Sequence, residues 1–105
     1  MNSKFLSMLG LAKRAGALIT GTDLVTKALP SGKIKLVIYA ENSSQNTEKK
    51  ITDKCKFYNT RCVKTDYNGE EIAHAVGKLS SVCVIGINDE NFSKELLTLI
   101  SKETR

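Results

Sequence analysis

Residues 34–40 read IKLVIYA and residues 82–87 read VCVIGI, and these two stretches decide the fold. Both are short and largely apolar, and neither alternates regularly between apolar and polar positions. Such runs are typical of strands that are buried on both faces of a sheet. Because a sheet with two buried faces needs helices above and below it, the two stretches predict an α/β protein.

The chain before these strands begins with helical periodicity. Residues 3–15 place apolar side chains at intervals of three and four positions, which predicts an amphipathic helix. Ser3 is expected to cap the start of this helix and Gly16 to end it. The basic pair just before Gly16 also suits the negative end of the helix dipole. Residues 17–20 then predict a very short strand.

The remaining chain alternates in the same way between helices and short strands. Thr22 is expected to cap a second helix, and Asn68-Gly69 is expected to form a turn. The other expected elements are helices over residues 23–29, 47–58 and 70–76, a strand over residues 62–64, and a final helix that opens at Asp89 or Asn91. Five helices that alternate with four strands predict a sheet held between two helical layers.

The length and composition of the chain suit one small domain. The 105 residues are 41% hydrophobic and 26% charged, which is ordinary globular composition. Domains usually contain about 100–150 residues, so residues 1–105 are expected to form a single domain. No apolar run has the length of a membrane span or the pattern of a signal peptide. Association with a membrane is therefore not expected.

The positive charge of the chain is unevenly distributed. The formal net charge is +5. Residues 1–65 contain twelve Lys or Arg against four Asp or Glu, a balance of +8, whereas residues 66–105 contain four against seven, a balance of −3. A basic face of this kind attracts polyanions, because each neutralised phosphate releases condensed counterions. The alternative is a basic face that is merely solvated.

The three cysteines, Cys55, Cys62 and Cys83, are odd in number and include no CxxC pair. They do not predict a disulfide framework, and they lack the closely paired spacing of structural zinc ligands. Cys55 and Cys83 are expected to be buried small hydrophobes. A reducing cytoplasm is therefore the expected location.

The sequence offers few groups for catalysis. His74 is the single histidine and falls within an expected helix. Glu70-Glu71 falls at the start of that helix, where carboxylates favour the positive end of the dipole. No GxxxxGK(S/T) or GxGxxG motif is present to hold nucleotide phosphates. The protein is therefore expected to be no enzyme and to need no cofactor or metal.

Residues 21–27, GTDLVTK, are the most informative candidate site. Gly21 would let another backbone approach closely, the first helical turn offers N–H groups, and Lys27 adds a positive charge. These properties suit an anion or a nucleic-acid backbone. The alternative is an ordinary capped helix whose Leu24 and Val25 or Ala28 pack inward. On chemistry alone the two interpretations are evenly matched.

Ordered segments across most of the chain resemble a known family. The segments are GLAKRAGALITGT at 10–22, DLVTKAL at 23–29, KLVIYA at 35–40, ENSSQNTEKKITDKC at 41–55 and HAVGK at 74–78. Their order and spacing resemble the family of large-subunit ribosomal proteins that recognise RNA kink-turns, and its small bacterial branch most of all. The resemblance implies a three-layer α-β-α sandwich with a mixed four-stranded sheet. It also implies binding of a kinked RNA helix with tandem sheared G·A pairs, without catalysis.

The resemblance also implies which residues contact RNA. In the family, the loop before the second helix and the first turn of that helix enter the widened groove at the kink. The corresponding residues here are Gly21, Thr22, Asp23, Leu24 and Lys27. Archaeal members have Asn-Glu where this chain has Asp23-Leu24, so Asp23 lacks amide donors and Leu24 cannot accept from a guanine edge. Each lost base contact would cost on the order of 1–3 kcal/mol.

Two further sets of residues complete the expected RNA site. The loop entering the last strand covers a flipped base in the family, and here it contains Lys78, Leu79 and Ser80. Basic residues could compensate for the weakened base contacts through phosphates; they are Lys13, Arg14, Lys27, Lys33 and Lys35.

Two functions of different class remain open at this point. The first is binding of a structured RNA, either a kink-turn or ribosomal RNA, as part of a ribonucleoprotein such as the ribosome. The second is a protein-interaction adaptor on the same fold, in which the RNA site has decayed at Asp23 and Leu24. A monomer is expected in either case.

Overall fold

The computed structural model describes residues 3–102. Helices and strands alternate along the described chain. In order they are α1 (Lys4–Arg14), β1 (Leu18–Thr20), α2 (Thr22–Ala28), the 3-10 helix η1 (Leu29–Ser31), β2 (Leu36–Tyr39), α3 (Gln45–Phe57), β3 (Arg61–Lys64), α4 (Gly69–Ala75), β4 (Val84–Ile87) and α5 (Glu90–Lys102). The five α-helices and four strands agree with the pattern expected from the sequence.

The four strands form one mixed sheet in the order β1-β4-β2-β3. Strand β4 pairs antiparallel with both β1 and β2, and β2 pairs parallel with β3. The strands formed by the two apolar runs, β2 and β4, are therefore the two inner strands, and every residue of both is buried. Both are shorter than their apolar runs.

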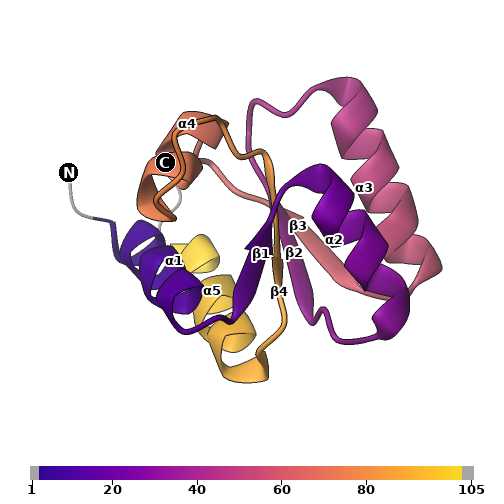
Figure 1. Cartoon of the computed structure of the whole chain (residues 1–105), viewed down its shortest axis with the longest axis horizontal. Helices are drawn as coiled ribbons and strands as arrows, with labels where there is room; N and C mark the ends of the chain where they lie inside the picture. The colour runs from indigo at the N-terminus through magenta and orange to yellow at the C-terminus, as the bar shows by residue number, and fades with distance from the viewer. Residues whose placement is uncertain (1–2, 103–105) are drawn as a thin grey trace.

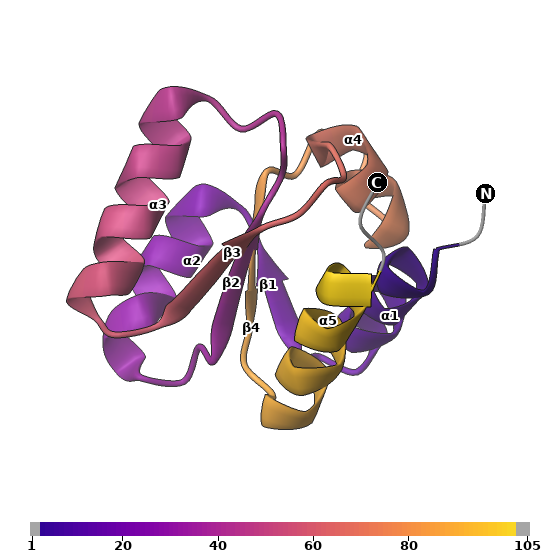
Figure 2. The same ribbon diagram turned by 180° about the vertical axis from the view of Figure 1, so that it is seen from behind.

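Helices cover both faces of this sheet. Helices α2 and α3 lie on one face, and α1, α4 and α5 lie on the other (Figures 1 and 2). The three layers confirm the α-β-α sandwich. No helix within residues 3–102 is long and apolar enough to cross a membrane.

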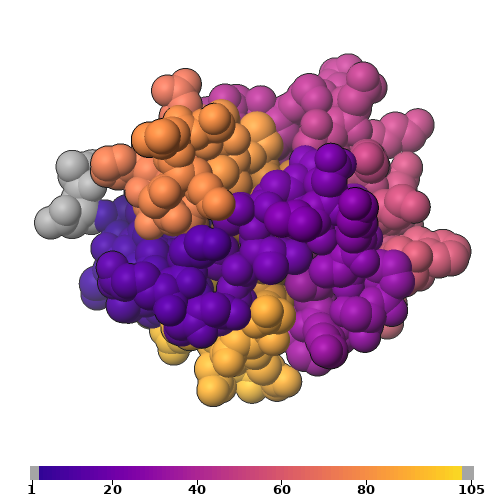
Figure 3. Space-filling view, viewed as in Figure 1, coloured from indigo at the N-terminus to yellow at the C-terminus, as the bar shows by residue number. Residues whose placement is uncertain are grey.

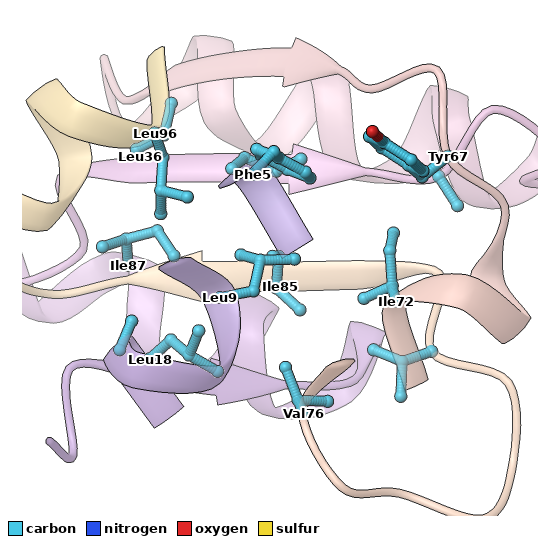
Figure 4. Packing of buried hydrophobic residues seen from close by; sticks show 14 of the residues in the cluster. Phe5, Leu9, Leu18, Leu36, Tyr67, Ile72, Val76, Ile85, Ile87 and Leu96 are labelled. Atoms are coloured by element: carbon cyan, nitrogen blue, oxygen red, sulfur yellow. The ribbon is translucent and has the colours of Figure 1, made fainter. Parts of the chain in front are cut away.

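The larger core lies between the sheet and the layer of α1, α4 and α5. Phe5 and Leu9 of α1 point toward the strands, and Leu96 of α5 points toward them from the neighbouring helix (Figure 4). The ring of Phe5 stacks on that of Tyr67 with 5.5 Å between ring centroids. The Tyr67 hydroxyl donates a 2.7 Å hydrogen bond to Ser3 Oγ, so the start of α1 is fixed to the chain just before α4.

The smaller core lies under α2 and α3 and positions the start of α2. Val25 of α2 is fully buried against this face of the sheet. Gly86 of β4 faces it, and a Cβ atom at Gly86 would lie 3.3 Å from Val25 Cγ2. The glycine therefore allows α2 to pack directly on the inner strand.

Two helix starts differ from the sequence prediction. Thr22 was expected to cap α2, but it is the first helical residue, and Gly21 is the N-cap with φ 102°. Asn68-Gly69 was expected to form a turn, but Asn68 is the N-cap of α4 and Gly69 is its first residue. Asn68 and Glu71 form a reciprocal capping box, in which each side chain accepts from the other residue's backbone N–H. These two hydrogen bonds explain why the chain begins a helix at Asn68-Gly69 instead of forming a turn.

Helix α3 begins at Gln45, two residues before the expected start, whereas the starts of α1 and α5 and the glycines that end α1 and α4 agree with the prediction. Ser3 Oγ accepts a hydrogen bond from the backbone N–H of Leu6 at the start of α1. Of the two candidates for opening α5, Asp89 is the capping residue, because its Oδ1 accepts from the Phe92 N–H at 2.9 Å. Gly16 and Gly77 follow α1 and α4 with positive φ, as expected for glycines that end helices.

Candidate nucleic-acid interface

The turn from β1 into α2 is tied to the inner strand β4. The backbone N–H of Gly21 donates a 2.8 Å hydrogen bond to the carbonyl of Val84, and the Gly21 carbonyl accepts from the N–H of Val25 at 3.1 Å. At φ 102° this backbone conformation strongly favours glycine, although a Cβ atom there would meet nothing within 4 Å. The backbone conformation at residue 21 thus favours glycine, and the space where its side chain would lie is open.

The loop between α4 and β4 reaches the same place from the other helical layer. Its ends are fixed by the N–H of Lys78, which donates to Ala73 at 2.9 Å, and by the N–H of Val82, which donates to Gly69 at 3.0 Å. Between these anchors, Leu79 is fully exposed to solvent. A large apolar side chain with no cover contributes little to folding and is available for contact with a partner.

The turn and the loop together border an open hollow of about 650 Å³. It is lined by Thr20, Gly21, Thr22, Thr47, Gly77, Lys78, Leu79, Ser80, Ser81, Val82 and Cys83. In the space-filling view, the orange segment that follows α4 lies beside the purple segment that begins α2 (Figure 3). The structure therefore brings two predicted parts of the RNA site into one concave surface.

The hollow is lined mainly by small and hydroxyl-bearing residues. Thr22 and Ser80 were expected at this site, whereas Thr47 was not. Thr47 is reached because α3 begins beside the turn; it is in the first turn of that helix and bonds to the capping residue Ser44. Hydroxyls both donate and accept hydrogen bonds, so they can meet the base edges and ribose hydroxyls of RNA.

The exposed face of α2 adjoins this hollow without lining it. Asp23, Leu24 and Lys27 all point to solvent, and Leu24 is 58% exposed. The alternative in which Leu24 packs inward is therefore wrong. Val25 alone is fully buried, and Ala28 is half-buried.

The other predicted cations lie at the opposite end of the sheet. Gly21 is bonded to Val84 at one end of β4, whereas Lys35 donates from its N–H to Ile87 at the other end. Val84 and Ile87 are three residue steps apart along the strand, which corresponds to about 10 Å. Lys33 is close in sequence to Lys35. Lys13 and Arg14 end α1, just before the strand residue Leu18, which pairs with Ile87.

The hollow is not lined by any of the basic residues at the Ile87 end of the sheet, which are Lys13, Arg14, Lys33 and Lys35. Their predicted contacts with phosphates would therefore have to lie on RNA that extends from the hollow toward the Ile87 end of the sheet.

The titratable groups with shifted pKa values lie outside the hollow. Burial raises the pKa of Tyr39, and the nearby carboxylate of Glu48 adds to the shift. Contact with Cys55 and burial raise the pKa of the Cys62 thiol, and the same contact lowers the pKa of Cys55. Cys55 is buried as expected, while Cys83 is only partly buried and lines the hollow.

His74 lies exposed on α4, outside the hollow. Among residues 3–102, no three His, Cys, Asp or Glu side chains are grouped so that they could hold a metal ion.

Comparison with known proteins defines the class to which this fold and site belong. Residues 3–97 match the model of the ribosomal protein L7Ae/L30e/S12e/Gadd45 family. The chain therefore belongs to this family, and the resemblance found in the sequence is confirmed.

Individual relatives extend over almost the whole chain. RNA-binding protein YlxQ of Bacillus subtilis (strain 168) is 35% identical over 97 residues, covering 92% of this chain and 95% of that protein. Large ribosomal subunit protein eL30 of Sulfolobus acidocaldarius is 33% identical over 96 residues, covering 91% and 92%. A solved structure of a protein with unknown function from Bacillus halodurans superposes with a TM-score of 0.87 at 38% identity, covering 95% of this chain and 99% of that one.

Proposed function

We propose that this protein is a non-catalytic RNA-binding protein whose hollow receives a kinked, structured RNA, either a kink-turn or a ribosomal RNA of similar shape. The observation that carries the proposal is the meeting of Gly21 and Thr22 with Lys78, Leu79 and Ser80 around one concave surface. Membership of the L7Ae/L30e/S12e/Gadd45 family and the name of the Bacillus subtilis relative, RNA-binding protein YlxQ, support it.

The chemistry of the hollow suits an RNA with an unstacked base. The exposed side chain of Leu79 offers an apolar surface against which such a base can pack. Lys78 beside it can neutralise a phosphate, and the hydroxyls of Thr22 and Ser80 can bond to base edges or to ribose 2′-hydroxyls. Recognition would then depend mainly on the shape of the RNA.

The face of α2 gives weaker base readout than a site with amide and carboxylate groups. Leu24 offers no polar group, and the carboxylate of Asp23 can only accept hydrogen bonds and repels nearby phosphates. Both side chains are exposed where the groove of the RNA would lie. We therefore expect moderate affinity that depends strongly on salt, because phosphate contacts would supply much of the binding energy.

A gel-shift titration tests the proposal directly. The protein is titrated against a kink-turn hairpin and against a matched hairpin in which Watson–Crick pairs replace the tandem G·A pairs. We expect the kinked hairpin to bind about tenfold more tightly, the effect of one good base contact. Equal binding of both hairpins would show that the hollow does not read the kink, and no binding of either at low salt would refute the proposal.

A further inference from the structure

Helix α3 connects the hollow to a second exposed surface. Thr47, near the start of the helix, lines the hollow. Thr47, Lys50, Lys54 and Phe57 follow one another at spacings of three or four residues, which places them on one face of the helix. Over ten residues this face extends about 15 Å from Thr47 to Phe57. Helix α3 lies at the outer side of its layer, beyond α2 (Figures 1 and 2).

Phe57 is an aromatic side chain that the fold leaves uncovered. It is 79% exposed, although it ends a helix whose Ile51 and Cys55 are fully buried. Its ring meets that of the half-buried Tyr58 edge to face, with 4.9 Å between centroids and an angle of 86° between planes. The contact with Tyr58 leaves most of the surface of Phe57 in solvent. This arrangement suits a base-stacking platform.

Two lysines that form no ion pair within the described part of the chain line the same hollow as this ring. Lys50, Lys54, Phe57, Tyr58 and Asp53 line a second hollow of about 420 Å³. Within residues 3–102, the Lys or Arg groups that lie within 4.0 Å of a carboxylate are Lys64, with Glu48, and Lys94, with Glu90. The ammonium groups of Lys50 and Lys54 are therefore not committed to ion pairs.

We propose that this face of α3 binds a single-stranded segment of the same RNA, with a base stacked on Phe57 and phosphates against Lys50 and Lys54. The inference rests on the proposed function, because the segment would be the continuation of the RNA held in the hollow. The 15 Å from Thr47 to Phe57 corresponds to roughly four or five nucleotides at about 3.4 Å per stacked nucleotide.

The composition of the surface favours RNA over a protein partner. Protein interfaces are depleted of lysine and contain a contiguous apolar centre, whereas here two lysines line the same hollow as the rings of Phe57 and Tyr58. An exposed aromatic beside free cations matches the two needs of a single strand, which are a stacking surface and phosphate neutralisation. Asp53 is the single acidic residue that lines this second hollow.

The test compares three RNAs: a blunt kink-turn hairpin and the same hairpin with six unpaired nucleotides added at either the 5′ or the 3′ end. For the wild-type protein, we expect one of the extended hairpins to bind about tenfold more tightly than the blunt one, as one stacked base and two phosphate contacts allow. Phe57→Ala and the double variant Lys50→Ala/Lys54→Ala should lose this gain while binding the blunt hairpin as the wild type does.

A matched control removes the same charge from a different face of α3. Lys49 and Lys56 are exposed and are separated by seven residues, so they share a face that excludes Lys50 and Lys54. Lys49→Ala/Lys56→Ala should keep the gain from the extension. If this variant loses as much as Lys50→Ala/Lys54→Ala, or if neither extension strengthens binding, the proposal is overturned.

A fluorescent variant provides a second measurement. The chain contains no tryptophan, so Phe57→Trp introduces a single indole at the exposed position. Stacking on a base should quench its emission when the extended hairpin is added, and the blunt hairpin should leave it unchanged. Equal quenching by both RNAs, or none by either, would contradict stacking at this position.

Failure of the two proposals can be told apart with a free ten-nucleotide RNA strand. If the blunt hairpin binds but neither extension adds affinity, the α3 surface is refuted and the function stands. If the hairpin does not bind but the free strand quenches Phe57→Trp, the kink-reading function is refuted, and of the α3 proposal only the binding of a single strand stands. If neither RNA binds, both proposals are refuted.

Discussion

The two ends of the sheet differ in how they could meet RNA. At the Val84 end of β4, backbone bonds fix the turn at Gly21 and the loop around Leu79 into a concave surface. At the Ile87 end lie Lys33 and Lys35, together with the basic end of α1, which are separated from that surface by the length of a strand. One end offers shape and hydroxyls, and the other offers mainly positive charge.

This difference suggests that the two ends of the sheet contribute to RNA binding in different ways, one to specificity and the other to affinity. A rigid concave surface can distinguish a kinked RNA from a straight one, because misfit leaves polar groups unpaired and a base uncovered. Exposed lysines attract phosphates of any sequence and lose strength as salt increases. If the protein works in this way, changes at the Val84 end should alter RNA preference. Changes at the Ile87 end should weaken binding only of RNAs long enough to reach that end, whatever their sequence.

The largest effect is expected at Gly21. Gly21→Ala places a Cβ on a backbone with φ 102°, and Gly32→Ala does the same at φ 75° beyond the far end of α2. Each substitution should lower the free energy of unfolding by on the order of 1–3 kcal/mol, measured by urea denaturation. Only Gly21→Ala should also weaken binding of the kink-turn hairpin, by about tenfold or more. Equal loss of RNA binding in both variants would mean that strain alone, and not the hollow, is responsible.

A smaller effect is expected at Leu79. Leu79→Ala should leave the free energy of unfolding within about 0.5 kcal/mol of the wild type, because this side chain is fully exposed. Affinity for the kink-turn hairpin should fall roughly five- to tenfold, since an apolar contact with a base is worth about 1–1.4 kcal/mol. Leu11→Ala on α1, also an exposed leucine, is the control and should not change RNA binding. If Leu79→Ala binds the hairpin as tightly as the wild type, the loop at Leu79 is not part of the RNA-binding site.

The smallest effect compares single lysines at the two ends. Lys78→Ala should reduce the slope of log affinity against log salt by about 1 for a short kink-turn hairpin, as expected for one lost phosphate contact. Lys33→Ala should leave the slope unchanged with that hairpin, because Lys33 lies beyond the far end of α2, away from the hollow. Filter binding across a salt series measures both slopes. A larger change in Lys33→Ala would place the RNA on the Ile87 end.

Much of the fold follows from local sequence patterns. The apolar runs around Val37 and Ile85 predicted two strands buried on both faces, and both strands are buried and lie in the middle of the sheet. Ser3 predicted the start of α1 because its short hydroxyl side chain can reach the free N–H of Leu6. Buried strands and helix caps depend on residues that are close together in the chain. They can therefore be predicted from the local sequence.

The misread boundaries show where local patterns compete. Thr22 has the chemistry of a cap, but the bond from Gly21 to Val84 moves the start of α2 back by one residue. Asn68-Gly69 has the composition of a turn, but Glu71 completes a capping box with Asn68 and begins a helix. Gly21-Thr22 and Asn68-Gly69 could each form either a turn or the start of a helix. In both places a hydrogen bond to a residue outside the dipeptide selects the observed conformation.

The site was only partly predictable for the same reason. The residues expected from family resemblance, Gly21 to Leu24 and the loop at Leu79, are separated by more than fifty positions in the chain. Thr47 was missed because nothing in its own neighbourhood marks it; it borders the hollow only because α3 packs beside α2 on one face of the sheet. The exposure of Phe57 was also hidden, since an aromatic near the end of an amphipathic helix is usually buried.

The sequence by itself determined the α/β class, the sequence of helices and strands, the basic character of the first two thirds and the family. These properties follow from apolar periodicity, capping chemistry and charge, which act over a few residues or simply add along the chain. Only the tertiary structure decided which strands are neighbours in the sheet and which of their ends lie side by side. As a result, the turn at Gly21 and the loop at Leu79 share a hollow, whereas Lys33 and Lys35 lie at the opposite end of the sheet. The physical reason is that strand order and helix packing bring together residues whose separation in sequence carries no local signal.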